Sequence, residues 1–159
     1  MIIQDVINHL EEFAPLAYAE DFDNVGLLIG NNKTKLTGIL VTLDTLETVV
    51  DEAIEEKCNL IVSFHPILFK GLKKITGKTY VERVILKAIK HDIAIYAIHT
   101  ALDNSLQGVN DAICNQLELE NKQVLIPQIQ TIKKLTTFVP KAEADQLRAA
   151  LFSVGAGNI

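Results

Sequence analysis

Residues 38–65 have the sequence GILVTLDTLETVVDEAIEEKCNLIVSFH, and this stretch decides the fold. Two apolar runs, at 38–43 and 59–64, flank a segment in which apolar residues recur at helical spacing. Short runs rich in Ile and Val, with a helix between them, are typical of buried parallel strands. The stretch therefore predicts a strand, a helix and a second strand of one parallel sheet.

The same alternation continues on both sides of this stretch. The predicted strands span 38–43, 59–64 and 93–98, and the predicted helices span 3–13, 45–57, 79–91 and 109–117. Strands that alternate with helices indicate an α/β protein in which helices cover both faces of a mostly parallel sheet. No Gly-rich phosphate-binding motif follows any of the strands, so the usual modes of nucleotide binding are not indicated.

The character of the sequence changes after about residue 120. The segment QVLIP (123–127) is strand-like, and so is KKLTTFVP (133–140), which leads into a helical pattern that begins at PKAEA. We therefore predict an α/β domain over residues 1–128 and the truncated start of a smaller, inserted α+β domain over 129–159. Because a helix followed by GAGN normally leads into another element, we expect an N-terminal portion of a longer protein. A mature chain with a short tail is the alternative.

Composition and charge exclude several classes of partner. The chain has 159 residues, of which 48% are apolar and 22% charged, and its net charge is −5. No apolar run approaches the roughly 20 residues that span a bilayer, and the N-terminus lacks the pattern of a signal peptide, so we predict a cytoplasmic location. The acidic balance argues against nucleic-acid binding. One basic cluster, Lys70, Lys73, Lys74 and Lys78, is either a solvated loop or an attractor for an anionic substrate.

Polar groups that can bind a metal follow the three predicted strands. Asp44 follows the first, His65 the second and His99 the third, and Asp103 lies four residues beyond His99. Because chemistry in open α/β sheets collects beyond the carboxyl ends of the strands, we expect these side chains at one edge. Imidazole and carboxylate groups are good ligands for zinc, manganese and iron. The sequence therefore predicts a candidate metal site there.

Each of these residues also has an ordinary structural role. Asp44 precedes a helix, where Asp commonly caps the N-terminus, and the other role open to it is to orient a ligand histidine. Asp103, with Asn104 and Ser105, could cap the next helix or turn instead of binding a metal. A histidine taken alone is more often structural than a ligand.

Three segments together resemble the NGG-interacting-factor-three-like family, whose members are often named GTP cyclohydrolase I type 2 homologues. The segments are EDFDNVGLLIG (20–30), the region from VTLD to FHPILF (41–69) and YAIHTALDNSLQGVND (96–111). The resemblance implies a two-domain α/β protein with a dinuclear metal site that assembles as a toroidal homohexamer. By motif position, His65 and Asp103 match metal ligands, and His99 matches a histidine near the metals, which we assign as catalytic.

The sequence departs from the family pattern at two places. Phe64 stands where the family often has a further ligand histidine, and the family's distal His and Glu, four residues apart, have no counterpart here. The resemblance implies two divalent ions (zinc, manganese or iron) in the complete protein. Because catalytic zinc typically takes three protein ligands, we expect weak or absent metal binding in this chain.

The sequence is compatible with three functions, and only the first of them is enzymatic. The resemblance implies a divalent-metal-dependent hydrolase, and the basic cluster at residues 70–78 would favour an anionic small molecule as its substrate. The second possibility is a non-catalytic regulatory or scaffold protein that binds metal and forms a ring-shaped homo-oligomer. The third is a Rossmann-like domain whose polar groups at the strand ends are only caps.

Overall fold

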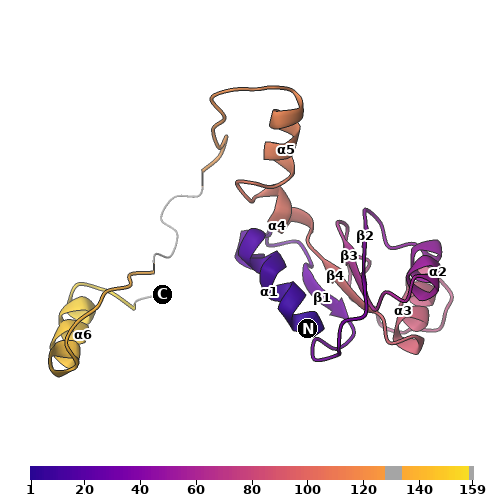
Figure 1. Ribbon diagram of the computed structural model, residues 1–159, viewed down its shortest axis with the longest axis horizontal. Coiled ribbons are helices and arrows are strands. Elements are labelled where there is room, and N and C mark those ends of the chain that lie inside the picture. The colour runs from indigo at the N-terminus through magenta and orange to yellow at the C-terminus, as the bar shows by residue number, and fades with distance from the viewer. Residues whose placement is uncertain (128–133, 158–159) are drawn as a thin grey trace. The chain divides into compact units, whose positions relative to one another are not determined.

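The fold is described by a computed structural model, which describes residues 1–127 and 134–157. The chain divides into two units, Met1–Glu120 and Asn121–Ile159. Unit 1 contains a four-stranded sheet in the order β1-β4-β3-β2 (Figure 1). Strands β2 (Ile39–Thr42), β3 (Leu60–Ser63) and β4 (Ala94–Ala97) are parallel, and β1 (Gly26–Ile29) joins β4 in the antiparallel sense. The predicted α/β class and mostly parallel sheet are confirmed.

Helices cover both faces of this sheet, as predicted. Helix α1 (Ile3–Phe13) lies on one face, and α2 (Glu47–Glu55) and α3 (Tyr80–Lys90) lie on the other (Figure 1). Successive residues of a strand point to opposite faces, so β3 and β4 contribute to two separate cores. Leu60, Val62 and Tyr96 pack with α1, whereas Ile61 and Ile95 pack with α2 and α3. Every residue of β3 and β4 is buried for this reason.

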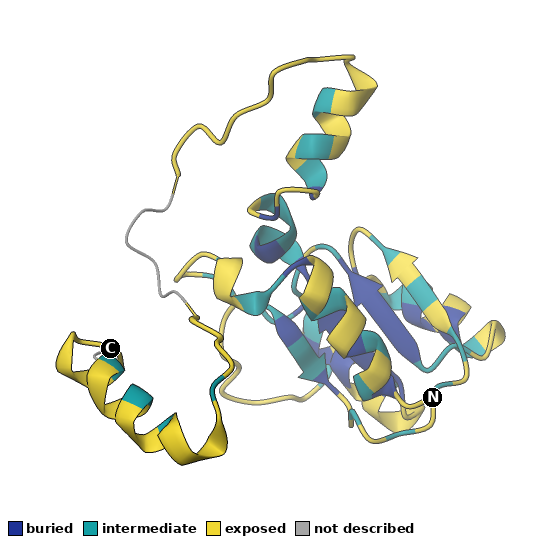
Figure 2. Cartoon of the chain, turned by 60° about the vertical axis from the view of Figure 1, so that its left-hand side comes forward, coloured by how far each residue is buried: buried dark blue, intermediate teal, exposed yellow. Residues whose placement is uncertain are grey.

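The edge strand β2 is the exposed part of the sheet. Its residues alternate between exposed and half-buried, and Val41 is 78% exposed. Figure 2 shows β2 in yellow and teal beside the dark blue strands of the interior. The order of the strands therefore places the candidate site at the end of two buried strands and one exposed strand.

Two short elements near the site were not predicted. Strand β1 has no alternating pattern; it begins at Gly26 and is followed by Gly30, and both glycines have positive φ. Only its antiparallel pairing with β4 defines it as a strand. Helix α4 (His99–Asp103) begins directly after β4, where the sequence left the geometry of these residues open. The 3₁₀ turn η1 (Leu16–Tyr18) and helix α5 (Val109–Gln116) complete unit 1.

Unit 2 contains the 3₁₀ turn η2 (Lys141–Glu143) and helix α6 (Ala144–Ser153). The helix predicted after PKAEA is confirmed. The strand character predicted for 123–127 and 133–140 is wrong for 123–127 and 134–140, which form no strand, and residue 133 lies outside the described residues. A strand needs a partner for its backbone groups, and these segments have none in the described chain. The domain boundary predicted at residue 128 also lies outside the described residues and stays a prediction. No helix in the described ranges is long and apolar enough to cross a membrane.

A buried carboxylate fixes the loop that precedes α3. Glu82 accepts hydrogen bonds from the Thr76 N–H (2.7 Å) and hydroxyl (2.9 Å), the Lys78 N–H (3.1 Å) and the Thr79 hydroxyl (3.2 Å). These bonds, led by the one from the Thr76 backbone, lower the pKa of Glu82 to about 2. These bonds therefore tie the C-terminal end of the loop that carries the basic cluster (residues 70–78) to the start of α3.

We expect Glu82→Gln to lower the midpoint of thermal unfolding at pH 7, because an amide cannot accept all four bonds. Because the pKa of Glu82 is lowered in the folded protein, its ionised carboxylate stabilises the fold at pH values above the ordinary pKa of 4.5. This stabilisation is lost as the pH falls towards about 2. The difference between wild type and variant should therefore shrink across that range, as followed by circular dichroism. Glu55→Gln, an exposed change on α2, is the control. A constant difference between pH 7 and pH 2 would contradict this account.

Candidate functional site

The carboxyl ends of the parallel strands bring two histidines side by side. The backbone ladder continues beyond the strands, because the His65 N–H donates to the Leu43 carbonyl and the His99 N–H to the Phe64 carbonyl, both at 3.0 Å. The imidazole rings of His65 and His99 lie 5.4 Å apart between centroids, in an edge-to-face arrangement. The expectation that strand ends deliver these two residues to one place agrees with this geometry.

Asp44 orients His65. One of its carboxylate oxygens lies 2.8 Å from His65 Nδ1, and both side chains are about half exposed. Helix α2 begins at Glu47, after the N-cap residue Leu46, so Asp44 does not cap it. Of the two roles open to Asp44, the structure therefore shows the contact with histidine. A histidine that donates its Nδ1 proton to a carboxylate keeps an unprotonated Nε2, which can accept a metal or a proton.

A second carboxylate, Asp23, holds His99 in the same way. Its oxygens lie 2.8 and 2.9 Å from His99 Nδ1, and they also accept bonds from the Thr100 hydroxyl and N–H and from the Asn24 N–H. The Asp23 side chain is completely buried, and 19% of the His99 side chain is exposed. Burial alone would raise the pKa of Asp23, but the hydrogen bonds, first those from Thr100 and His99, lower it overall. A carboxylate that stays ionised in this place fixes the ring and tautomer of His99.

The backbone at His99 is in a conformation that few side chains adopt. Its φ is +25°, at the junction where β4 becomes α4. Non-glycine residues with positive φ are uncommon, and they cluster at functional sites when the surroundings impose them. Here the Asp23 contacts and the turn into α4 impose it, which points the imidazole towards His65 and not into the core.

Aromatic side chains surround the two imidazoles. The Phe64 ring lies 5.0 Å from the His65 ring and 5.5 Å from the His99 ring, both edge to face. Phe69 lies 6.4 Å from His99, and it contacts Phe22 at 6.5 Å. Phe64 thus provides an apolar wall where a histidine would add a ligand. The site combines two oriented imidazoles with aromatic neighbours, and the His65 side chain is 46% exposed to solvent.

Asp103 ends helix α4, four residues after His99, which places both on one face of that helix. Its backbone carbonyl accepts a bond from the Asn110 side chain, but its carboxylate has no hydrogen-bond partner among the residues that the structure describes. The capping role is absent, because α5 begins after Gly108 without a side-chain cap. Asn104 and Ser105 donate instead to groups near η1.

The donors present fit a divalent ion in kind but not in number. Two imidazoles with carboxylates at Nδ1 have the arrangement common for histidine ligands, and the Asp103 carboxylate is unengaged within the described chain. However, residues 1–127 and 134–157 contain no cluster of three His, Cys, Asp or Glu side chains placed to hold a metal ion. The assignment of His65 and Asp103 as ligands, and of His99 as catalytic, therefore stays a prediction.

Asp23 holds His99, but no sequence pattern predicted it as a site residue. It lies 76 positions before His99, in the loop that leads into the unpredicted strand β1. The one sequence feature that could have indicated a role for Asp23 is its place in EDFDNVGLLIG. That segment supported the family resemblance, but no site residue was predicted from it. Without the antiparallel pairing of β1 and β4, nothing in the sequence places Asp23 beside His99.

The fold and the strand-end histidines define an α/β protein with a candidate site built from carboxylate-held imidazoles. The chain matches, over residues 1–156, the family described as Duf34/NIF3 (NGG1p interacting factor 3), and it belongs to that family. The predicted family is therefore confirmed.

Relatives and solved structures agree with this assignment. A Bacillus subtilis protein named GTP cyclohydrolase 1 type 2 homolog is 46% identical over 157 residues, which are 98% of this chain and 42% of that protein. The structure of a Bacillus cereus protein related to NIF3 has a TM-score of 0.76 at 36% identity, and the match covers 100% of this chain and 44% of that one. Reduced HcgD from Methanocaldococcus jannaschii has a TM-score of 0.74 at 30% identity, with 79% and 50% covered. The chain thus spans about two fifths of the length of its curated relatives.

Proposed function

We propose that this chain carries part of the active site of a divalent-metal-dependent hydrolase. The observation that supports the proposal is the pair of imidazoles, each with a carboxylate at Nδ1 and their rings 5.4 Å apart. The name GTP cyclohydrolase 1 type 2 homolog, borne by relatives, supports the reaction class. The homohexamer implied by the resemblance and the cytoplasmic location predicted from the sequence both stay predictions.

In this proposal the side chains divide the chemistry. His65 and Asp103 would hold the ion, and a bound ion would supply Lewis acidity to a water and to a carbonyl, imine or phosphoryl group. His99 accepts or gives a proton at Nε2, because buried Asp23 keeps its Nδ1 protonated and its ring in place. Phe64 supplies an apolar edge-to-face contact to both rings. Further ligands would have to come from outside the described residues.

The first test is metal binding by the chain itself. We expect calorimetric titration with Zn²⁺ or Mn²⁺ to show weak binding, since fewer than three protein ligands are assembled. His65→Ala should weaken it by at least about tenfold, because one of the few donors is lost. His9→Ala, which removes a histidine that is 78% exposed on α1, is the control. Equal binding by both variants would overturn the site.

Turnover separates the hydrolase from the alternative, a regulatory or scaffold protein. Hydrolysis of GTP and of phosphoesters should be assayed with each metal, in wild type and in His99→Gln. Metal binding that depends on His65 without turnover of any substrate would favour the non-catalytic function. If the His99→Gln variant hydrolyses a substrate as fast as wild type does, His99 has no role in the mechanism.

A further inference from the structure

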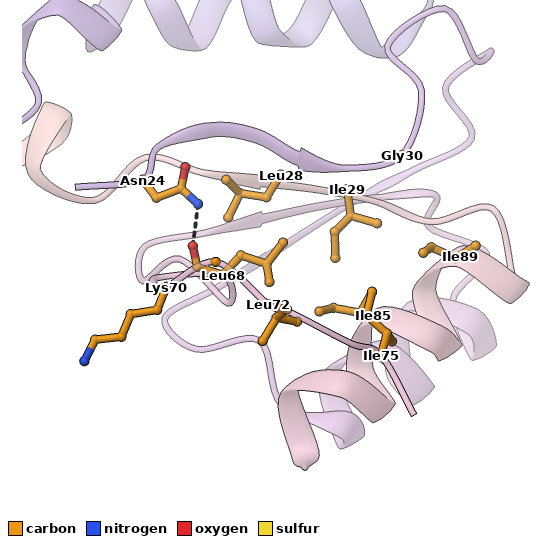
Figure 3. A pocket seen from close by; sticks show the side chains of 11 residues that line it. Asn24, Leu28, Ile29, Gly30, Leu68, Lys70, Leu72, Ile75, Ile85 and Ile89 are labelled. Atoms are coloured by element: carbon orange, nitrogen blue, oxygen red, sulfur yellow. Dashed lines mark hydrogen bonds between the residues drawn. The ribbon is translucent and has the colours of Figure 1, made fainter. Parts of the chain in front are cut away.

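A pocket of about 470 Å³ lies between β1, α3 and the loop 68–75 (Figure 3). Its walls are aliphatic: Leu28 comes from β1, Leu72 and Ile75 from the loop, and Ile85 and Ile89 from α3. Leu72, Ile75 and Ile89 are 41%, 45% and 56% exposed, so the walls are reachable from solvent. The volume is within the usual range for small-molecule sites.

One end of this pocket adjoins the candidate site. Asn24 and Leu68 lie at that end, where the Asn24 side-chain amide donates to the Leu68 carbonyl (Figure 3). Their chain neighbours, Asp23 and Phe69, both contact His99. A ligand whose apolar part occupies the pocket would therefore present its other end near His99.

The lining has one charged residue. Lys70 lies at the same end as Asn24, and the remaining walls carry no charge (Figure 3). The amide of Asn24 is already engaged with Leu68, which leaves few polar groups to recognise the edges of a nucleobase. The combination of aliphatic walls with one cation at the end nearest His99 fits a chain with an anionic head.

We propose that the pocket binds the alkyl chain of an anionic amphiphile, with its carboxylate or phosphate head beside Lys70. The corresponding substrate would be an ester or phosphoester with an aliphatic chain of about six to ten carbons. This substrate class rests on the proposed hydrolase function. The binding itself does not depend on metal or turnover, so the two can fail separately.

The chain contains no tryptophan, so one placed in the pocket reports on its occupant alone. In Leu72→Trp, we expect hexyl, octyl and decyl phosphate, titrated as monomers, to shift the emission to the blue. Affinity should rise about fourfold for each added methylene, as expected for chains that enter an apolar site. Phe152→Trp, in α6 of unit 2, should show no shift. If Leu72→Trp fails to fold, the affinities for the same three alkyl phosphates can be measured by calorimetry on the unmodified chain.

Two further changes test the walls and the cation. Ile75→Ser should weaken decyl phosphate roughly tenfold, and Lys70→Gln should weaken it about two- to fivefold without affecting decanol. Lys73→Gln, on the same loop but not part of the lining, is the control for charge. Affinity that does not depend on chain length, binding only to phosphatidylglycerol vesicles, or tighter binding of GMP than of decyl phosphate would each overturn the inference.

Discussion

Replacing Asp23 by alanine is expected to lower the free energy of unfolding by about 3 kcal/mol, a large share of the 5 to 15 kcal/mol typical of a domain. The fully buried carboxylate accepts bonds from His99, Thr100 and Asn24, and its loss leaves these donors without their partner. For a unit of this size the change corresponds to a midpoint lower by roughly 10 °C. Urea denaturation at pH 7 measures it directly.

The pH dependence identifies the ionised carboxylate as the cause. Because the pKa of Asp23 is lowered in the folded protein, its contribution is complete above the ordinary value of 3.8 and is lost as the pH falls below it. The difference between wild type and Asp23→Ala should therefore shrink at pH 3. Asp21→Ala, two residues away and exposed, should be nearly neutral at both values.

Asp23→Asn separates volume from charge. The amide has the same shape, but it cannot accept from all the donors, so we expect a loss between those of wild type and alanine. If the hydrolase site is as proposed, both Asp23 variants should also lower turnover by about ten- to a hundredfold, because His99 loses the carboxylate that holds its ring. A stability loss below about 1 kcal/mol in Asp23→Ala would show that the carboxylate does not anchor His99.

The parallel part of the fold could be predicted because its signals are local. Runs such as LIVS in β3 and AIYA in β4 are wholly buried, and their apolar character shows this without knowledge of their neighbours. The strand-end rule then placed His65 near His99 correctly. These are consequences of backbone geometry, which repeats in every parallel sheet.

The partners of the two histidines could not be predicted with the same ease. Asp44 precedes a helix, so capping was an equally ordinary role, and only the His65 ring 2.8 Å away distinguishes the two. Asp23 depends on the antiparallel strand β1, whose four residues carry no periodic pattern. In unit 2 the apolar residues of 134–140 suggested a strand, but pairing requires a neighbour that local sequence does not reveal.

Gly30→Ala is expected to destabilise the protein by about 3 kcal/mol, through backbone strain and steric overlap together. Gly30 follows β1 with a φ of +99°, and a Cβ there would lie 2.7 Å from both the Cα and the Cβ of Ala94 in β4. Ala94 is buried in the centre of the sheet and cannot move aside. The change therefore pushes β1 away from β4.

Gly71→Ala is the matched control for this prediction. A Cβ at Gly71 meets nothing within 4 Å and φ is not positive, so we expect a change within about 0.5 kcal/mol. Because β1 continues from the loop that carries Asp23, Gly30→Ala should also weaken the hydrogen bonds that hold His99 and Thr100. This effect can be measured by NMR as faster hydrogen exchange of the His99 and Thr100 amide protons. Equal stability of the two glycine variants would show that the close approach of β1 to β4 is not required for the site.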